Sequence, residues 1–241
     1  MSAKIIVALD NMEVDQALTV VAKLQSAGIE WVKVGLELYT KGGNKLIETL
    51  KSKGHKVFLD LKLYDIPNTV AQTIKSIESM GVDLTTVHAM GGIKMLESAQ
   101  GALSKNTLNI VAVTLLTSFS DYEIENLLPE KIINKNNLKK EWFLHLLTQT
   151  KEAGLSGIVS SAQELNEYKS ELSKLNWKSK PIFVTPGIRF SEDATQDQAR
   201  VLDPKSAAEN GATHLVVGRP ILQPASGTIE EAAKKFLKAL Q

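Results

Sequence analysis

Short apolar runs alternate with longer segments of helical periodicity along the whole chain. Eight of these runs have the length and apolar content of buried β-strands: Lys4–Leu9, Trp31–Gly35, Val57–Leu61, Asp83–Val87, Asn109–Thr114, Gly157–Val159, Pro181–Val184 and His214–Val217. Between the runs, apolar residues recur at helical spacing, as in Glu13–Ala27, where Gly28 ends the pattern. Strands that alternate with helices predict an α/β fold with a parallel sheet.

The number of strand–helix units favours a closed barrel. Eight units in 241 residues match the usual size of one (β/α)8 TIM barrel. The alternative is a doubly wound open sheet, in which about six or seven strands are more usual. No linker rich in Pro, Gly or Ser divides the sequence, so we expect residues 1–241 to form one (β/α)8 domain. Two connections are long, Ser118–Asn137 and Gly187–Val201, and long loops in a compact domain are often functional.

Polar and ionisable residues stand where the predicted strands end. In chain order they are Asp10, Lys33, Asp60 with Lys62, His88, Thr117, Arg189 and Arg219. Charge is unexpected in a parallel strand that is buried on both faces, whereas the carboxyl-terminal rim of a TIM barrel carries the active site. Any one of these residues alone is typical of a solvated rim position or of a hydrogen-bonded structural histidine. Their coincidence on one rim predicts a functional site.

The alternation of side chains along the third strand assigns directions to its residues. Asp60 and Lys62 are two positions apart and therefore project to the same side. Phe58 shares their parity and is predicted to fill the barrel interior, whereas Leu59 and Leu61 are predicted to face the helices. The sequence thus places a carboxylate and an amine together above the apolar interior of the barrel.

Composition excludes several classes of site. The chain has no cysteine, which rules out disulfides, thiolate nucleophiles and cysteine-ligated zinc or iron–sulfur centres. A formal net charge of +1 gives no indication of binding to nucleic acid or to an anionic membrane surface. No stretch approaches about 18 uninterrupted apolar residues, and the amino-terminal segment lacks the pattern of a signal peptide. We therefore expect a cytoplasmic protein.

One ten-residue run carries the most specific motif. Residues 60–69 read Asp-Leu-Lys-Leu-Tyr-Asp-Ile-Pro-Asn-Thr. The run resembles the signature of the orotidine 5′-phosphate decarboxylase family, Asp-x-Lys-x-x-Asp-Ile-x-x-Thr. Similar matches follow at other strand ends: Val-Ala-Leu-Asp10, Val-Lys33-Val-Gly, Leu-Leu-Thr117-Ser, Thr-Pro-Gly-Ile-Arg189 with Asp-Gln198, and Val-Val-Gly218-Arg219-Pro. The resemblance thus extends over most of the chain.

The resemblance implies decarboxylation of orotidine 5′-phosphate to uridine 5′-monophosphate (UMP), the last step of de novo UMP synthesis, without a metal or cofactor. It assigns Lys62 as the cation that stabilises a carbanion-like C6 and then protonates it. Catalytic roles are implied for Lys33, Asp60, Lys62 and Asp65. Substrate contacts are implied for Asp10, Lys33, Asp60, Thr69, Thr117, Arg189, Gln198, Gly218 and Arg219. Within this set, Asp10 and Lys33 would contact the ribose, and Thr117 would contact the pyrimidine. The phosphate would be bound by Arg189, Gly218 and Arg219.

The resemblance also implies a homodimer in which Asp65 and Thr69 are lent across the interface. Two alternatives remain open. One is a Mg²⁺-dependent phosphosugar decarboxylase or aldolase, because such barrels share the shorter motif Asp-x-Lys-x-x-Asp and hold the metal through carboxylates. The other is a non-catalytic phosphate-binding barrel. Against the Mg²⁺-dependent enzyme stand the segment Ile66–Thr69 after the motif and Gln198 in the long seventh loop. Against the non-catalytic barrel stands the presence of a charged residue at every position where the resemblance expects one.

Overall fold

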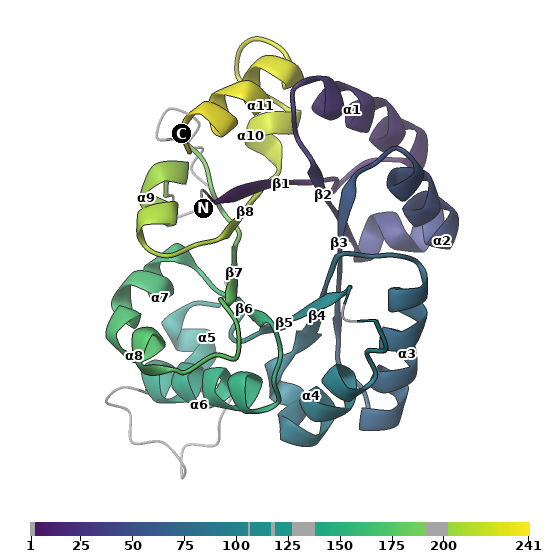
Figure 1. Cartoon of the computed structure of the whole chain (residues 1–241). Helices are drawn as coiled ribbons and strands as arrows, with labels where there is room; N and C mark the ends of the chain where they lie inside the picture. Colours follow the sequence, from purple (N-terminus) through teal and green to yellow (C-terminus); the bar gives the residue numbers. More distant parts are fainter. Residues whose placement is uncertain (1–2, 106, 117–118, 127–137, 191–201) are drawn as a thin grey trace.

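The computed structural model describes residues 3–105, 107–116, 119–126, 138–190 and 202–241. Its strands are parallel and close into a barrel in chain order, β1 to β8, with helices around the outside, as Figure 1 shows along the barrel axis. The strands are β1 (Lys4–Ala8), β2 (Trp31–Gly35), β3 (Lys56–Leu63), β4 (Leu84–His88), β5 (Asn109–Val113), β6 (Gly157–Val159), β7 (Ile182–Thr185) and β8 (His214–Val217). The predicted (β/α)8 barrel is confirmed.

The helices occupy the segments between the strands. They are α1 (Val14–Ser26), α2 (Leu36–Ser52), α3 (Pro67–Ser79), the short 3₁₀ turn η1 (Ala89–Gly91), α4 (Gly92–Gly101), α5 (Asp121–Asn126), α6 (Leu138–Glu152), α7 (Ala162–Glu167), α8 (Lys169–Lys174), α9 (Pro204–Glu209), α10 (Arg219–Leu222) and α11 (Ile229–Lys238). The predicted helix Glu13–Ala27 is α1, whose first and last predicted residues are its caps.

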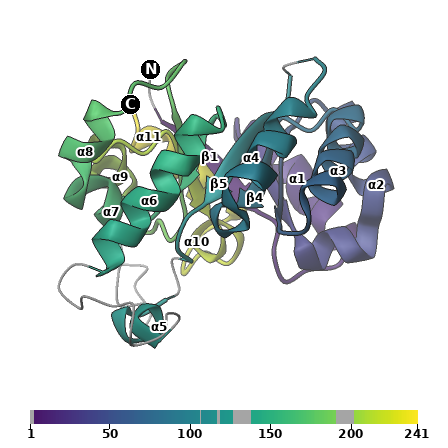
Figure 2. The same cartoon turned by 90° about the horizontal axis from the view of Figure 1, so that it is seen from below.

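Strand bounds differ from the predictions by one or two residues at most. The largest change is in β3, which was expected to span Val57–Leu61 and extends to Lys56 and Leu63, because these residues pair with β2 and β4. Asp10 lies beyond the end of β1 instead of ending it, and His88 is the last residue of β4 instead of following it. Part of the long connection Ser118–Asn137 is helical, because it contains α5, which stands clear of the helical ring in Figure 2.

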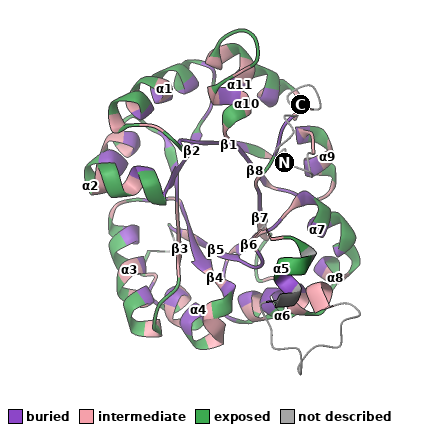
Figure 3. Ribbon diagram, turned by 180° about the vertical axis from the view of Figure 1, so that it is seen from behind, coloured by how far each residue is buried: buried purple, intermediate pink, exposed green. Residues whose placement is uncertain are grey.

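Alternating residues of the strands form two separate apolar layers. Phe58 packs inside the barrel, in a cluster with Ile6, Ala8, Trp31, Leu84, Val111, Val184 and Val216. Leu59 belongs to the larger core between strands and helices, and Leu61 packs against that core. Figure 3 shows the resulting distribution, with buried strands inside a ring of helices whose outer faces are exposed. The predicted directions of these side chains are therefore confirmed.

The amino-terminal end of the barrel contains a buried histidine. His214, the first residue of β8, meets the ring of Trp31 edge-on at a centroid distance of 5.4 Å. Burial, with a smaller effect of the charge on Lys4, lowers the pKa of His214 from 6.5 to about 4. Between these two values the unfolded chain binds a proton that the folded protein does not.

We expect this difference to make the free energy of unfolding fall as pH drops from about 6.5 to about 4, by up to about 3 kcal/mol from His214. The measurement is urea unfolding of the wild type and of His214→Gln at pH 7 and pH 4.5. The variant should lose less stability on acidification than the wild type. Equal losses in the two proteins would contradict the assignment to His214.

Candidate active site

The loops that follow the strands surround one large cavity of about 1010 Å³. Its apolar wall is the upper part of the barrel interior and comprises Ala8, Phe58, Val113, Val159, Val184 and Val216. Seven of the predicted site residues line it: Asp10, Lys33, Asp60, Lys62, Arg189, Gly218 and Arg219. The fold therefore gathers side chains that are up to about two hundred positions apart in the sequence around one apolar chamber.

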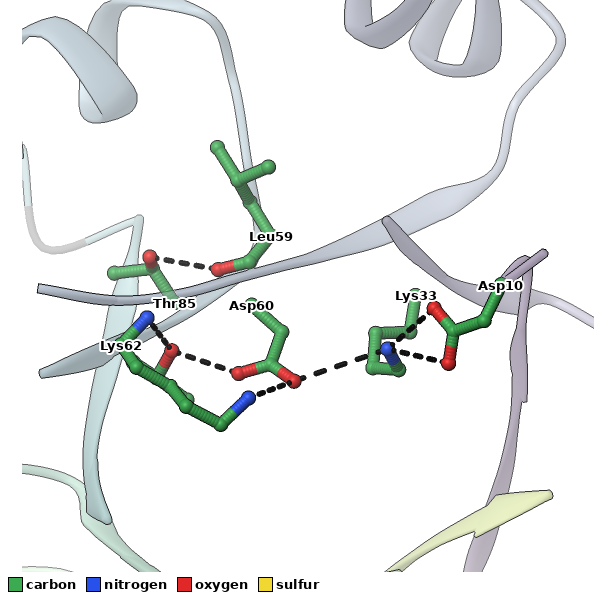
Figure 4. A network of polar contacts seen from close by, with 7 residues as sticks. Asp10, Lys33, Leu59, Asp60, Lys62 and Thr85 are labelled. Atoms are coloured by element: carbon green, nitrogen blue, oxygen red, sulfur yellow. Dashed lines mark hydrogen bonds and ion pairs between the residues drawn. The ribbon is translucent and has the colours of Figure 1, made fainter. Parts of the chain in front are cut away.

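Four charged side chains form a row of alternating sign across the ends of β1, β2 and β3. Lys33 Nζ donates to Asp10 Oδ1 at 2.8 Å and Oδ2 at 3.0 Å, and lies 3.8 Å from Asp60 Oδ2. Lys62 Nζ donates to the same Asp60 Oδ2 at 2.8 Å (Figure 4). The two central side chains are the least exposed, at 10% for Lys33 and 13% for Asp60. Water screens charges only weakly at such buried positions, so the attraction between neighbouring opposite charges stabilises the row.

The chain approaches this row closely at Gly35. A Cβ at this position would lie 3.0 Å from Asp10 Oδ1 and 3.1 Å from Lys33 Nζ, closer than a side chain is normally tolerated. Gly35 is two residues after Lys33 on β2 and so shares its direction. The missing side chain leaves the space in which the Asp10–Lys33 ion pair forms.

A large bulge in β3 carries the motif residues. Leu59 pairs with Thr85 and Leu63 pairs with Val87, so that residues 60–62 of β3 stand opposite Thr86 alone. Within this bulge Lys62 has φ of 49°, in the left-handed region that non-glycine residues rarely adopt. Bulges of this kind redirect side chains, and here the Lys62 and Asp60 side chains both line the cavity.

The segments that follow β7 and β8 bring two arginines to the cavity. Arg189 is nearly buried, and its backbone N–H donates to the Leu202 carbonyl at 3.2 Å. Arg219 is exposed and follows Gly218 directly. A planar guanidinium offers a fork of donors that suits phosphate oxygens, and the ends of strands seven and eight are the usual phosphate position in this fold.

Two predicted site residues of the described part of the chain, Asp65 and Thr69, are absent from the cavity lining. Both are exposed. Asp65 Oδ1 accepts a hydrogen bond from the backbone N–H of Ile66 at 2.6 Å. Thr117 and Gln198 lie outside the described residues.

His88 lies beside the charged row without joining it. Its ring stacks on Tyr64 at a centroid distance of 5.7 Å, and its Nδ1 accepts from the backbone N–H of Met90 at 3.4 Å. Burial lowers the pKa of His88, and the positive charge of Lys62 lowers it further. These effects favour the neutral ring near neutral pH.

Two residues that shape the charged row, Gly35 and Thr86, were given no role on the basis of the sequence. Both could have been found from strand parity, because each is two positions from a residue that was identified, Lys33 and His88 respectively.

In the described part of the chain no three His, Asp or Glu side chains are grouped so as to hold a metal ion. Nor does any described helix have the length and apolar character needed to cross a membrane.

Comparison with known proteins gives one consistent result. The family model described as Orotidine 5′-phosphate decarboxylase / HUMPS family matches residues 3–236. The orotidine 5′-phosphate decarboxylase of Carboxydothermus hydrogenoformans is 42% identical over 248 residues, which cover 100% of this chain and 97% of that protein. The enzyme of the same name from Legionella pneumophila is 42% identical and covers 92% and 93% of the two chains. The crystal structure of orotidine 5′-phosphate decarboxylase from Lactobacillus acidophilus matches with a TM-score of 0.80 and 33% identity over 99% of both chains.

Proposed function

The chain belongs to the orotidine 5′-phosphate decarboxylase / HUMPS family, and we propose that the row Asp10–Lys33–Asp60–Lys62 is the centre at which it acts. The reaction is the decarboxylation of orotidine 5′-phosphate to UMP, a carboxy-lyase step of pyrimidine biosynthesis. The observation that carries the proposal is the 2.8 Å contact between Lys62 and Asp60 at the edge of the apolar cavity. It places a cation and a proton donor where the substrate ring would lie.

The chemistry requires stabilisation of negative charge on carbon. When the bond between C6 and the carboxylate breaks, its electron pair stays on C6 and CO₂ leaves. Lys62 stabilises this carbanion-like centre electrostatically and then transfers a proton from Nζ to C6, after which solvent restores the ammonium group. A fixed charge in a largely apolar cavity is effective because it needs no reorganisation as the charge develops.

Asp60 and Lys33 support this role of Lys62. Asp60 Oδ2 holds the Lys62 ammonium at 2.8 Å, and Lys33 stands on the other side of the same oxygen at 3.8 Å. Asp60 also sets a negative charge beside the substrate carboxylate, and that repulsion is relieved when the carboxylate departs as neutral CO₂. Asp10 and Lys33 hold the ribose hydroxyls.

The phosphate binds far from the reacting carbon. Arg189, Gly218 and Arg219 line the part of the cavity that follows β7 and β8, and they supply two guanidinium groups and a glycine backbone. Binding energy from a group remote from C6 positions the ring and excludes water from it. The roles of Thr117 at the pyrimidine edge and of Gln198 over the nucleotide stay predictions.

The active form we propose is a homodimer that acts in the cytoplasm. Asp65 and Thr69 are exposed and do not line their own cavity. Large apolar side chains next to Asp65 in sequence are unusually exposed, namely Tyr64 at 62% and Ile66 at 66%. Met90, which accepts a hydrogen bond from Tyr64 at its carbonyl, is also exposed. Large apolar side chains exposed near one another support a protein interface at this place. Across it, Asp65 and Thr69 would complete the site of the partner subunit.

The experiment that tests the function is turnover of orotidine 5′-phosphate by the purified protein after exhaustive treatment with EDTA, followed by ultraviolet absorbance. We expect rapid conversion to UMP, because the proposed centre uses only side chains. Activity only on a sugar phosphate with Mg²⁺ would support the metal-dependent alternative. Tight binding of UMP without turnover of either substrate would support the phosphate-binding barrel.

A further inference from the structure

Thr86 of β4 forms hydrogen bonds to both central residues of the β3 bulge. Its hydroxyl accepts from the backbone N–H of Lys62 at 2.8 Å and donates to Asp60 Oδ1 at 2.9 Å. The direction of both bonds is fixed, because a backbone N–H only donates and a carboxylate only accepts. Thr86 is fully buried and does not line the cavity. Its hydrogen bonds reach the cavity through Asp60 and Lys62, whose side chains line it.

The same hydroxyl supports the unusual backbone of Lys62. The ladder between β3 and β4 is interrupted between the pairs Leu59–Thr85 and Leu63–Val87, and the Lys62 N–H in this gap donates to a side chain. A backbone N–H in such a position needs a partner, and a left-handed φ of 49° persists only where the surroundings hold it. Thr86 provides that partner from the neighbouring strand.

We propose that Thr86 is a positioning residue for the decarboxylation, an inference that rests on the function proposed above for Lys62 and Asp60. From one oxygen atom it holds the backbone of Lys62 and the carboxylate of Asp60, and so fixes where Lys62 Nζ meets Asp60 Oδ2. Threonine suits this task because branching at Cβ restricts its rotamers and keeps the hydroxyl in place. Asp60 Oδ1 is thereby engaged, and Oδ2 is left to the two lysines.

Thr85 offers a matched comparison within the same strand. It too is fully buried, and its hydroxyl donates to the Leu59 carbonyl at 2.9 Å (Figure 4). Replacing it with valine removes one buried hydroxyl of β4, as at Thr86, but leaves the contacts of Asp60 and Lys62 intact. The difference between the two valine variants isolates the effect on the charged row.

The experiment measures kcat and KM for orotidine 5′-phosphate in Thr86→Val, Thr86→Ser and Thr85→Val, together with hydrogen exchange of the Lys62 amide. Because displacement of a catalytic group by about 1 Å costs about 10²-fold in rate, we expect Thr86→Val to lower kcat about 10²-fold with KM changed less than about threefold. Thr86→Ser keeps the hydroxyl and should recover most of kcat. The Lys62 amide should exchange faster in Thr86→Val and unchanged in Thr85→Val.

Equal kcat in the two valine variants would overturn the proposal, as would a Thr86→Ser variant as slow as Thr86→Val, which would mean that the methyl group matters and the hydroxyl does not. If Thr86→Val does not fold, Thr86→Ala removes the same hydroxyl without added bulk and is judged by the same comparison. Failure of the proposed function is distinguishable, because it would appear as absence of turnover in the wild type. The amide exchange of Lys62 is measurable even then.

Discussion

Replacing Lys62 with alanine is expected to lower kcat for orotidine 5′-phosphate by at least about 10³-fold while UMP still binds measurably. The variant loses both the cation that stabilises charge at C6 and the donor that protonates it, and each of these contributions alone is worth about 10²-fold or more. Product binding survives because the phosphate and ribose contacts come from other residues of the cavity. Steady-state kinetics and calorimetric titration with UMP measure the two effects separately.

Lys41 provides the matched control for this substitution. Its side chain is 33% exposed, against 36% for Lys62, and it forms ion pairs with Glu13 and Glu37 at the starts of α1 and α2. Lys41→Ala therefore removes a lysine of similar exposure and pairing that does not line the cavity. We expect it to keep normal turnover. Near-normal turnover in Lys62→Ala would end the role proposed for that residue.

Mixing two inactive variants is expected to restore activity if the sites are shared between subunits. In a hybrid dimer of Lys62→Ala with Asp65→Ala, one of the two sites receives Lys62 from one chain and Asp65 from the other, both intact. Equal mixing with free exchange makes about half of the dimers hybrid, so about one quarter of all sites are native. The measurement is recovery of turnover towards about one quarter of the wild-type rate, with subunit exchange verified independently.

The control for this experiment pairs Lys62→Ala with Asp60→Ala. Because Asp60 and Lys62 contact each other within one chain, no hybrid of these two variants contains a native site. Turnover should stay at the level of the unmixed proteins. Recovery in both mixtures would point to contamination or repair, and no recovery in the first mixture despite demonstrated exchange would contradict the shared site.

The sequence predicted the barrel because the two patterns that indicate this fold are local in the chain. Strand length and helical periodicity are set by neighbouring residues, and eight alternations in 241 residues leave few alternatives to closure. Polar residues at strand ends, such as Asp10 and Lys33, then identify the functional rim, since every parallel strand delivers its carboxyl end to the same side. Parity also gave the correct directions for Phe58 and Leu59.

The details of the charged row were decided by pairing between strands that are distant in sequence. The bulge of β3 arises because Leu59 and Leu63 pair with residues of β4 that are only two positions apart, and no pattern within β3 encodes this. The role of Thr86 depends on that bulge, because only there does Lys62 offer its N–H to a side chain. The close approach at Gly35 likewise exists only once β1 and β2 lie side by side.

By itself, then, the sequence determined the fold and the kinds of residue at its rim, because hydrophobic periodicity and strand ends are properties of contiguous segments. It also placed Asp60 and Lys62 on one side of one strand. Only the tertiary structure decided that Lys33 stands against both Asp10 and Asp60 and that Lys62 takes a left-handed backbone. The physical reason is that distances, register and burial depend on which segments meet across the barrel.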